Sequence, residues 1–409
     1  MPTYMQRHWG GDPNAMGGKA ARRGFVYDAY IPDPIADLDP ALPGAVVDEI
    51  VRAAEALAKL QATRAYPHLE VLSRQLLRAE SIGSSWIEGL SVSQRRVLHA
   101  IYGAGSAGET ARAVAGNIDA METALDRADA DQPIDPECIR SIHHALLVGT
   151  RDAHIAGRFR DRQNWVGGDA TSPRNAEFIP PPEDHVEPLM ADLCAFLART
   201  DLPPILQAAI AHAQFETIHP FADGNGRVGR ALIHVVLRRR GAAPHYVPPI
   251  SLVLATNAQR YIRGLTSYRA GNLDDWLVLF ARSIISATGR SERLAFEIAE
   301  LQDGWRAAAG NPRRDSAAEK LIQVLPGRPV LDGHAAQLIT GSSDEATRKA
   351  LNLLESVGVL TPIEPVKKHG RVWEAPSIMG LLDEFEWDLA TPTRAEQERR
   401  AAPPLPPNP

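Results

Sequence analysis

The sequence has few of the features that mark secreted, metal-binding or membrane proteins. Its two cysteines, Cys138 and Cys194, form no CxxC pair, which argues against a disulfide framework or a cysteine-rich zinc site. No apolar run approaches the roughly 20 residues of a membrane helix, and residues 1–24 hold no apolar segment typical of a secretory signal. The formal net charge of −6 provides no general attraction to nucleic acid or anionic membranes. We therefore expect a cytoplasmic protein whose thiols stay reduced.

What the chain does contain is enough apolar material for two or three domains. A length of 409 residues suffices for several hydrophobic cores. The hydrophobic share of 44% and the charged share of 23% are ordinary for a soluble protein. The two ends differ, because residues 1–24 are rich in glycine and basic residues and residues 391–409 in proline and charge. We expect both ends to be disordered.

The most informative segment is residues 219–230, which read HPFADGNGRVGR. Gly224 and Gly226 permit positive φ angles, and Asn225 is among the non-glycine residues that tolerate them. Successive amide groups in such a turn form an anion-binding nest. The residues that follow are typical of a helix, whose first amide groups and dipole also favour phosphate.

The side chains of this segment suit the handling of nucleotide phosphates. His219 is a candidate general base, since its ordinary pKa lies near neutrality. Asp223 is a candidate Mg²⁺ ligand, and Arg227 and Arg230 share one face of the helix. Taken singly, these residues are typical of a helix end, a surface turn and a solvated face. Their combination indicates a functional site.

The segment matches the HxFx(D/E)GNGRxxR signature at every fixed position, so the chain resembles the Fic family of AMP-transferring enzymes. The resemblance implies an all-α Fic-fold core with a short β-hairpin flap. It also implies transfer of AMP from ATP to a Ser, Thr or Tyr hydroxyl of a target protein, with Mg²⁺ as cofactor and self-modification as a further possibility. Gly226 stands where related phosphotransferases carry lysine, which favours AMP transfer.

The resemblance also assigns roles within the motif. His219 would deprotonate the target hydroxyl, and Asp223 would bind Mg²⁺ between the α- and β-phosphates. Gly224, Asn225 and Gly226 would hold the phosphates. Arg227 and Arg230 would engage the β- and γ-phosphates.

A second motif lies upstream, at residues 84–89, which read SSWIEG. Ser84 and Glu88 share a helix face, and Gly89 can end that helix. Spacing alone favours a solvated glutamate beside a terminal glycine, because short polar motifs recur by chance. The Fic resemblance gives the motif a role, because Ser84, Glu88 and Gly89 fit the inhibitory pattern (S/T)xxxE(G/N).

In that role, Glu88 would form a buried pair with Arg230 and exclude the γ-phosphate from its productive position. The N-terminal location of the motif is that of the class II arrangement. In some related proteins the same glutamate supports hydrolytic removal of AMP. A hydrolase, or an enzyme with both activities, therefore remains an alternative.

The resemblance divides the chain into an N-terminal helical region at residues 25–91 and a Fic core at residues 92–290. Residues 157–182 are expected to be non-helical and to form the flap, which would bind the target segment as an added strand. An ordinary loop is the alternative. Tyr261 and Leu265 are candidates for the adenine-side wall, although packing of Tyr261 in the core is an equal possibility.

Residues 311–380 predict a separate winged-helix module. Three short helices are expected at residues 317–325, 333–340 and 344–357, followed by strands at 359–360 and 371–374. Such modules often bind DNA, and a DNA-binding regulator with a nucleotide-sensing core is a second alternative. The module holds nine Lys and Arg residues against eight Asp and Glu, however, and lacks a basic footprint. A protein-docking or dimerisation role is therefore favoured for it.

Overall fold

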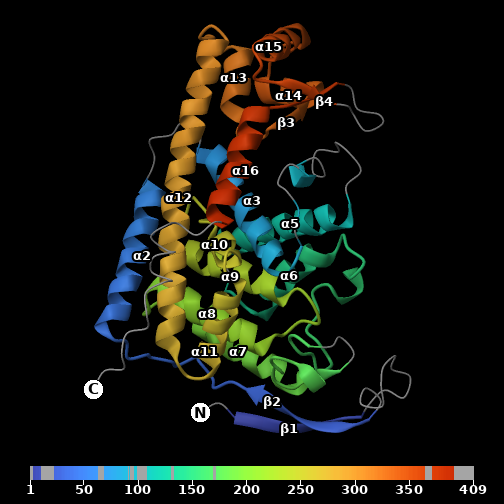
Figure 1. Cartoon of the computed structure of the whole chain (residues 1–409), viewed down its shortest axis with the longest axis vertical. Helices are drawn as coiled ribbons and strands as arrows, with labels where there is room; N and C mark the ends of the chain where they lie inside the picture. Colours follow the sequence, from blue (N-terminus) through green and yellow to red (C-terminus); the bar gives the residue numbers. More distant parts are fainter. Residues whose placement is uncertain are drawn as a thin grey trace. The chain divides into compact units, whose positions relative to one another are not determined.

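The chain folds into two compact units, each assembled from segments far apart in the sequence. Figure 1 shows the helices and strands in sequence colours. The computed structural model describes residues 3–10, 23–62, 69–90, 92, 96–98, 108–129, 133–168, 172–363 and 371–390. Unit 1 comprises residues 1–58, 116–244 and 259–282, and unit 2 comprises residues 59–115, 245–258 and 283–409. Within the described ranges, no helix is long and apolar enough to cross a membrane.

A buried pair of helices, α8 (Pro204–Ile218) and α9 (Asn225–Arg239), forms the centre of unit 1. The two helices pack against each other, and Gly229 permits their close approach. A Cβ atom at Gly229 would lie 2.6 Å from Oε1 of Glu216. The helix predicted after the motif is thus confirmed. The other helical elements with residues in unit 1 are α2 (Gly44–Ala62), α5 (Glu109–Asp129), α6 (Pro136–Leu147), η1 (Ala153–Ile155), η2 (Pro173–Asn175), η3 (Glu183–His185), α7 (Val186–Leu197), α11 (Ala258–Arg269) and α12 (Leu273–Ala308).

A two-stranded antiparallel ribbon precedes the helices of unit 1. Strand β1 (Thr3–Trp9) pairs with β2 (Phe25–Ile31), with Met5 opposite Ala29. The expectation of a disordered leader is therefore wrong for residues 3–9. The missed signal is the alternation of half-buried Met5, Arg7 and Trp9 with exposed residues between them. Residues 11–22 of the expected leader lie outside the described residues, as does the expected tail at 391–409.

The expected flap forms a short hairpin in unit 1. Val166 pairs with Phe178 in an isolated antiparallel bridge, in which the Val166 N–H donates to the Phe178 carbonyl at 2.8 Å. One short helical turn, η2, interrupts the segment that was expected to be entirely non-helical. Ser172 begins this turn by accepting a hydrogen bond from the Arg174 N–H, and Pro173 supplies the fixed φ of a first helical position.

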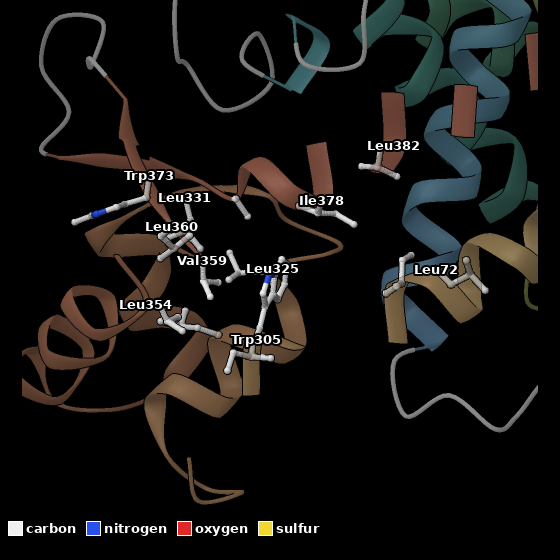
Figure 2. Packing of buried hydrophobic residues seen from close by; sticks show 14 of the residues in the cluster. Leu72, Trp305, Leu325, Leu331, Leu354, Val359, Leu360, Trp373, Ile378 and Leu382 are labelled. Atoms are coloured by element: carbon white, nitrogen blue, oxygen red, sulfur yellow. The ribbon is translucent and has the colours of Figure 1, made fainter. Parts of the chain in front are cut away.

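Unit 2 has a hydrophobic core shared by an N-terminal helix and the C-terminal elements. Figure 2 shows part of this core, with Leu72 of α3 and Leu382 of α16 at one end and Trp305, Leu354 and Trp373 at the other. The elements of unit 2, besides the remainder of α12, are α3 (Leu69–Ile87), α10 (Ile250–Ala255), α13 (Ala317–Val324), β3 (Val330–Asp332), α14 (Gly333–Thr340), α15 (Asp344–Ser356), β4 (Thr361–Ile363), β5 (Val372–Glu374) and α16 (Pro376–Ala390).

The C-terminal elements have the order of a winged helix. Three helices are followed by strands that join a three-stranded antiparallel sheet in the order β3-β5-β4. The expected strand at residues 359–360 is wrong, because Val359 and Leu360 are buried core residues that precede β4. Strand β3 and helix α16 were not expected. With three residues, β3 is too short for sequence periodicity to be detected.

The two units do not follow the boundaries expected at residues 25–91, 92–290 and 311–380. Helix α12 runs from Leu273 to Ala308, past the expected end of the core. Helix α3 belongs to the same unit as the C-terminal elements. Such groupings depend on contacts between distant segments, which local patterns in a sequence do not encode.

Candidate active site

The loop between α8 and α9 carries the residues singled out in the sequence. Helix α8 ends at Ile218, and the next residue, His219, is its C-cap and has the left-handed backbone angles φ 52° and ψ 58°. Its N–H still donates to the Phe215 carbonyl at 2.9 Å. A non-glycine residue in this region is uncommon and is held there by its surroundings. The chain therefore turns sharply at the candidate base, whose side chain is half-buried.

Asn225 fixes the loop from inside. Its Oδ1 accepts a hydrogen bond from the Phe221 N–H at 2.8 Å, and its Nδ2 donates to the Phe221 carbonyl at 2.8 Å. Both functional groups of this buried side chain are thus engaged by the backbone of the loop. Any contact of Asn225 with a phosphate is therefore expected from its backbone N–H and not from its side chain.

His143 of α6 packs against the loop and hydrogen-bonds to it. Its ring stacks on Phe221, with centroids 3.8 Å apart and planes at 11°. Its Nδ1 accepts a hydrogen bond from the Gly157 N–H at 2.9 Å, so in the neutral ring Nε2 carries the proton and donates to the Asp223 carbonyl at 3.0 Å. Burial lowers the pKa of His143 to about 4, which keeps this tautomer neutral at physiological pH.

Arg160 and Asn164 of the flap segment hold the same loop by its carbonyl groups. Arg160 donates from Nε to the His219 carbonyl at 2.9 Å and from Nη2 to the Pro181 carbonyl at 2.5 Å. Asn164 Nδ2 donates to the Phe221 carbonyl at 2.9 Å. Burial lowers the pKa of Arg160 to about 10, so the guanidinium remains charged at neutral pH.

The sequence did not identify His143, Arg160 or Asn164 as functional residues. Arg160 and Asn164 lie within the segment interpreted as the flap, and His143 lies in a helix with no motif of its own. The only available signal for His143 was a polar side chain between the apolar Ile142 and Leu146, whereas Arg160 and Asn164 lie in a polar stretch and do not stand out from it. Their roles follow from contacts across 55 or more residues.

The start of α9 presents backbone amide groups without a capping side chain. Gly224 is the N-cap residue with φ 78°, and no side chain there accepts from the first amides of the helix. A Cβ atom at Gly224 would lie 2.9 Å from Cδ2 of the buried Leu146. Glycine is therefore required both for the left-handed angle and for space.

Charged side chains of both signs adjoin this helix start. The Asp223 carboxylate is 58% exposed and lies 3.4 Å from Nη2 of Arg227, which is 8% exposed. Arg230 is 1% exposed and is among the largest fully buried side chains. Asp223 is thus accessible to a ligand from solvent, while both arginines belong to the packed base of the site.

The donor set around the loop fits a Mg²⁺ ion only in one way. Among the described residues, no three His, Cys, Asp or Glu side chains cluster as a metal site. Mg²⁺ usually binds through one or two carboxylates together with substrate phosphates and water. The single exposed carboxylate of Asp223 fits that pattern.

The two candidates for the adenine wall lie in the core of unit 1. Tyr261 is 3% exposed, and its hydroxyl group lies 2.8 Å from Nε2 of His212. Its ring is 6.1 Å from that of Trp276. Leu265, one turn later in α11, is 7% exposed. These contacts agree with core packing of Tyr261, and an adenine-binding role of either residue stays a prediction.

The second motif ends helix α3 of unit 2. Ser84 is completely buried, and a Cβ atom at the preceding Gly83 would collide with the Leu252 backbone of α10. Gly89 has φ 77° and donates to the Trp86 carbonyl at 2.9 Å, so the expected helix end at this glycine is confirmed. Glu88 is exposed, whereas a buried pair was expected. Its pairing with Arg230 stays a prediction.

Two segments of the chain, one containing each motif, match models of known protein families. Residues 133–237 match the model of the Fic/DOC family, and residues 47–126 match that of the Fic/DOC family N-terminal region. The chain therefore carries a Fic/DOC family domain, preceded by the N-terminal region of that family. The loop between α8 and α9 is its Fic motif.

The curated relatives of this Fic protein match over part of its length. Protein adenylyltransferase fic-1 from Caenorhabditis briggsae and from Caenorhabditis elegans are each 33% identical to it over 135 residues, which is 32% of this chain. Protein adenylyltransferase Fic from Drosophila virilis is 33% identical over 115 residues. The chain spans only 23% of the two Caenorhabditis proteins and 20% of the Drosophila protein.

A solved structure shows the same fold over most of the chain. A Fic family protein from Desulfovibrio desulfuricans aligns with a TM-score of 0.53 at 21% identity. The alignment covers 82% of this chain and 97% of that one. The expected all-α Fic-fold core with a short flap and a C-terminal winged helix is therefore confirmed, as a mostly helical Fic fold with small antiparallel sheets and a C-terminal sheet with helices.

Proposed function

We propose that this Fic protein is a protein adenylyltransferase that transfers AMP from ATP to a Ser, Thr or Tyr hydroxyl of a target protein. The observation that carries the proposal is the braced loop between two buried helices. It places a half-buried histidine, an exposed aspartate and an uncapped helix start within seven residues, at positions 219–225. The partial similarity to protein adenylyltransferases supports the same reaction.

His219 acts as the general base in this proposal. It accepts the proton of the target hydroxyl while the hydroxyl oxygen forms a bond to the α-phosphorus of ATP. The bond from that phosphorus to the bridging oxygen breaks, and pyrophosphate leaves with the electron pair. Catalysis of this kind depends mainly on positioning and electrostatic stabilisation. The αL backbone of His219, held by Arg160 and Asn164, supplies that positioning.

The start of α9 binds the phosphates. Backbone N–H groups of Gly224, Asn225 and Gly226 face the anion, and the helix dipole favours its charge. Arg227 and Arg230 neutralise the β- and γ-phosphates. Asp223 holds Mg²⁺, which supplies further charge neutralisation when bound.

The flap fixes the target segment. An extended segment would add to it through main-chain hydrogen bonds, which place the hydroxyl group irrespective of most side chains. The flap is well suited to this task, because Arg160 ties it to the same loop that carries His219. Flap and candidate base therefore keep a fixed separation.

We further propose that Glu88 inhibits the enzyme by pairing with Arg230, which would otherwise receive the γ-phosphate. The motif ends α3, a helix anchored by its close approach to α10 at Gly83. Because Glu88 is exposed, its side chain has room to leave such a pair. Substitution Glu88→Gly should raise AMP transfer by about tenfold or more, within the usual range of coupling between sites.

One labelling experiment tests both proposals. Wild type, Glu88→Gly and Glu88→Gly/His219→Ala are incubated with ATP labelled at the α-phosphate or at the γ-phosphate, and protein-bound label is measured. We expect label from the α-phosphate alone, increased by Glu88→Gly and lost with His219→Ala. Circular dichroism of the His219→Ala variant serves as the control for folding.

The other outcomes separate the alternatives. Label from the γ-phosphate would establish phosphotransfer and contradict the proposal. Equal labelling of wild type and Glu88→Gly would remove the inhibitory role alone. If no variant is labelled, incubation with AMP-modified protein tests the hydrolase, and release of AMP there would replace transfer as the function.

A further inference from the structure

A cavity of about 690 Å³ lies beside the Fic motif in unit 1. One stretch of the chain, residues 154–165 without residues 156 and 157, provides nearly all of its lining. The remaining lining residue is Ala222, which is exposed between Phe221 and Asp223 of the catalytic loop. The cavity thus opens next to the residues proposed to carry out transfer.

The two arms of the flap differ. The first arm, residues 161–165, lines this cavity, whereas the second arm, residues 178–180, already has hydrogen-bond partners. In the second arm, the Phe178 carbonyl accepts from Val166, and the Ile179 carbonyl accepts from the Tyr30 N–H of β2 at 3.0 Å. The Pro180 carbonyl accepts from Gln163 Nε2 at 2.9 Å. The second arm is therefore held between the first arm and the ribbon. A bound segment has room along the first arm, at residues 161–165.

The rim of the cavity carries an excess of positive charge. Arg158 and Arg162 both line it and are exposed, and Arg162 is 91% exposed. Arg160 also lines it, but its guanidinium is turned into four backbone carbonyl contacts. Asp161 is the one acidic lining residue.

The Asp161 carboxylate does not cancel this charge. It lies 4.0 Å from Nε of Arg162, and both side chains are more than 90% exposed. Ion pairs of this kind contribute little, because water screens them. Arg158 makes no side-chain hydrogen bond or ion pair with any described residue. Two cationic groups are thus available to a ligand in the cavity.

We propose that Arg158 and Arg162 select target segments that carry acidic residues beside the acceptor hydroxyl. This inference rests on the proposed adenylyltransferase function and names the class of target sequence. An extended segment along residues 161–165 has side chains on alternate faces, so residues flanking the acceptor reach the cavity rim. Charge complementarity at such a rim favours the matching partner and rejects the opposite one.

The nucleotide is not the occupant in this arrangement. Its phosphates are assigned to the start of α9, beyond Asp223, whereas the cavity touches the motif only at Ala222. The two arginines therefore act on the target and leave the binding of ATP unchanged. That separation gives the test a readout that a general loss of activity would not produce.

Peptide binding is measured first, without turnover. Three fluorescent peptides share one threonine, flanked by aspartate, by alanine or by lysine, and bind to full-length His219→Ala protein in an anisotropy titration. We expect the aspartate peptide to bind about tenfold more tightly than the lysine peptide at low salt, with the preference falling as salt rises. Adding Arg158→Glu and Arg162→Glu should reverse the preference. Arg127→Glu, an exposed arginine on α5 outside the cavity, should leave it unchanged.

Transfer is then measured with His219 intact. In Arg158→Glu/Arg162→Glu we expect kcat/KM for the aspartate peptide to fall about tenfold, while KM for ATP stays constant and the lysine peptide becomes the better substrate. That gain shows that the variant is folded. Equal binding of all three peptides, or a parallel rise in KM for ATP, would overturn the inference. If the preference is seen in binding but no peptide is modified, the acidic-segment site stands and the proposed transferase function fails.

Discussion

The start of α9, which follows the loop with the Fic motif, and the helix starts of the C-terminal module are built in opposite ways. In the module, α13, α14 and α15 each begin with a side chain that accepts from the helix backbone, at 3.2 Å from Ser316, 2.7 Å from Asp332 and 3.3 Å from Ser343. Helix α9 begins with Gly224 and has no such cap. A capping side chain satisfies amide groups for the sake of stability. In the proposed function, the absence of a cap at the start of α9 leaves those groups for the phosphates.

The bracing of the two regions also differs. The loop between α8 and α9 is held by polar contacts from His143 of α6 and from Arg160 and Asn164 of the flap segment. The module is held by apolar packing against α3 and α10 of the same unit (Figure 2). A deletion of residues 311–409 would therefore expose the core around Leu72. Point substitutions are the better test of the role of the module.

The largest effect is expected where a cap is introduced into the catalytic loop. Gly224→Ser should lower AMP transfer by about a hundredfold, because displacing a catalytic loop by about 1 Å has effects of that size. The Cβ atom of the new serine meets Leu146, and the serine would have to adopt the left-handed angles of Gly224. Its hydroxyl group would also compete with phosphate for the amide groups at the start of α9. Transfer to protein is measured beside Gly224→Ala, which adds the Cβ alone. Full activity of both variants would contradict the assignment of this helix start to phosphate.

The internal brace of the loop can be removed next. Asn225→Ala should lower the free energy of unfolding by about 2–4 kcal/mol, since it leaves the buried N–H and carbonyl groups of Phe221 without their partner. Urea titration measures the loss. Asn225→Asp is the matched control, because it keeps the acceptor and loses the donor, and we expect an intermediate value. A neutral result for Asn225→Ala would show that the loop does not depend on this brace.

The two units should respond to pH in opposite directions. Burial lowers the pKa of His143 in unit 1 to about 4 from 6.5. The unfolded state therefore binds more protons between these values, and stability falls as the pH drops through that window. In unit 2, burial and then the charge of Asp383 raise the pKa of Glu386 to about 8 from 4.5. The native state binds more protons there, and stability falls as the pH rises through that window.

Replacing either residue by glutamine separates the two contributions to the pH dependence of stability. On acidification to about pH 5, the free energy of unfolding of the wild type should fall by an amount on the order of 2 kcal/mol, and His143→Gln should remove this loss. Glu386→Gln should be more stable than wild type at about pH 8 and not at about pH 4. Urea unfolding across pH measures both. If either variant retains the wild-type pH profile, the corresponding burial is not what sets the protonation state.

The smallest effect is expected for a cap in the module. Ser343→Ala should destabilise the protein by about 1 kcal/mol and leave AMP transfer to a peptide unchanged, because the cap serves only the backbone of α15. Thermal unfolding and label incorporation are measured on the same sample. A matching loss of transfer would show that the module contributes to the active site.

Much of the local structure could be predicted from the sequence. The helix after the motif, the helix end at Gly89 and the three helices of the module follow from periodicity, glycine and capping residues, which act within a few positions of each other. The β1–β2 ribbon was missed, because its two strands are joined by residues that resemble a disordered leader. Strand β3 was missed because three residues carry no detectable alternation.

By itself, the sequence determined that a histidine, an aspartate and a glycine-flanked helix start follow each other within one turn region, since their order is covalent. Only the tertiary structure decided that His143 and Arg160 hold this region. It also decided that Tyr261 is hydrogen-bonded to His212 in the core, and that α3 shares its core with the C-terminal module. Each of these contacts joins residues tens or hundreds of positions apart. Their energy depends on packing and desolvation in the folded chain, which no local pattern contains.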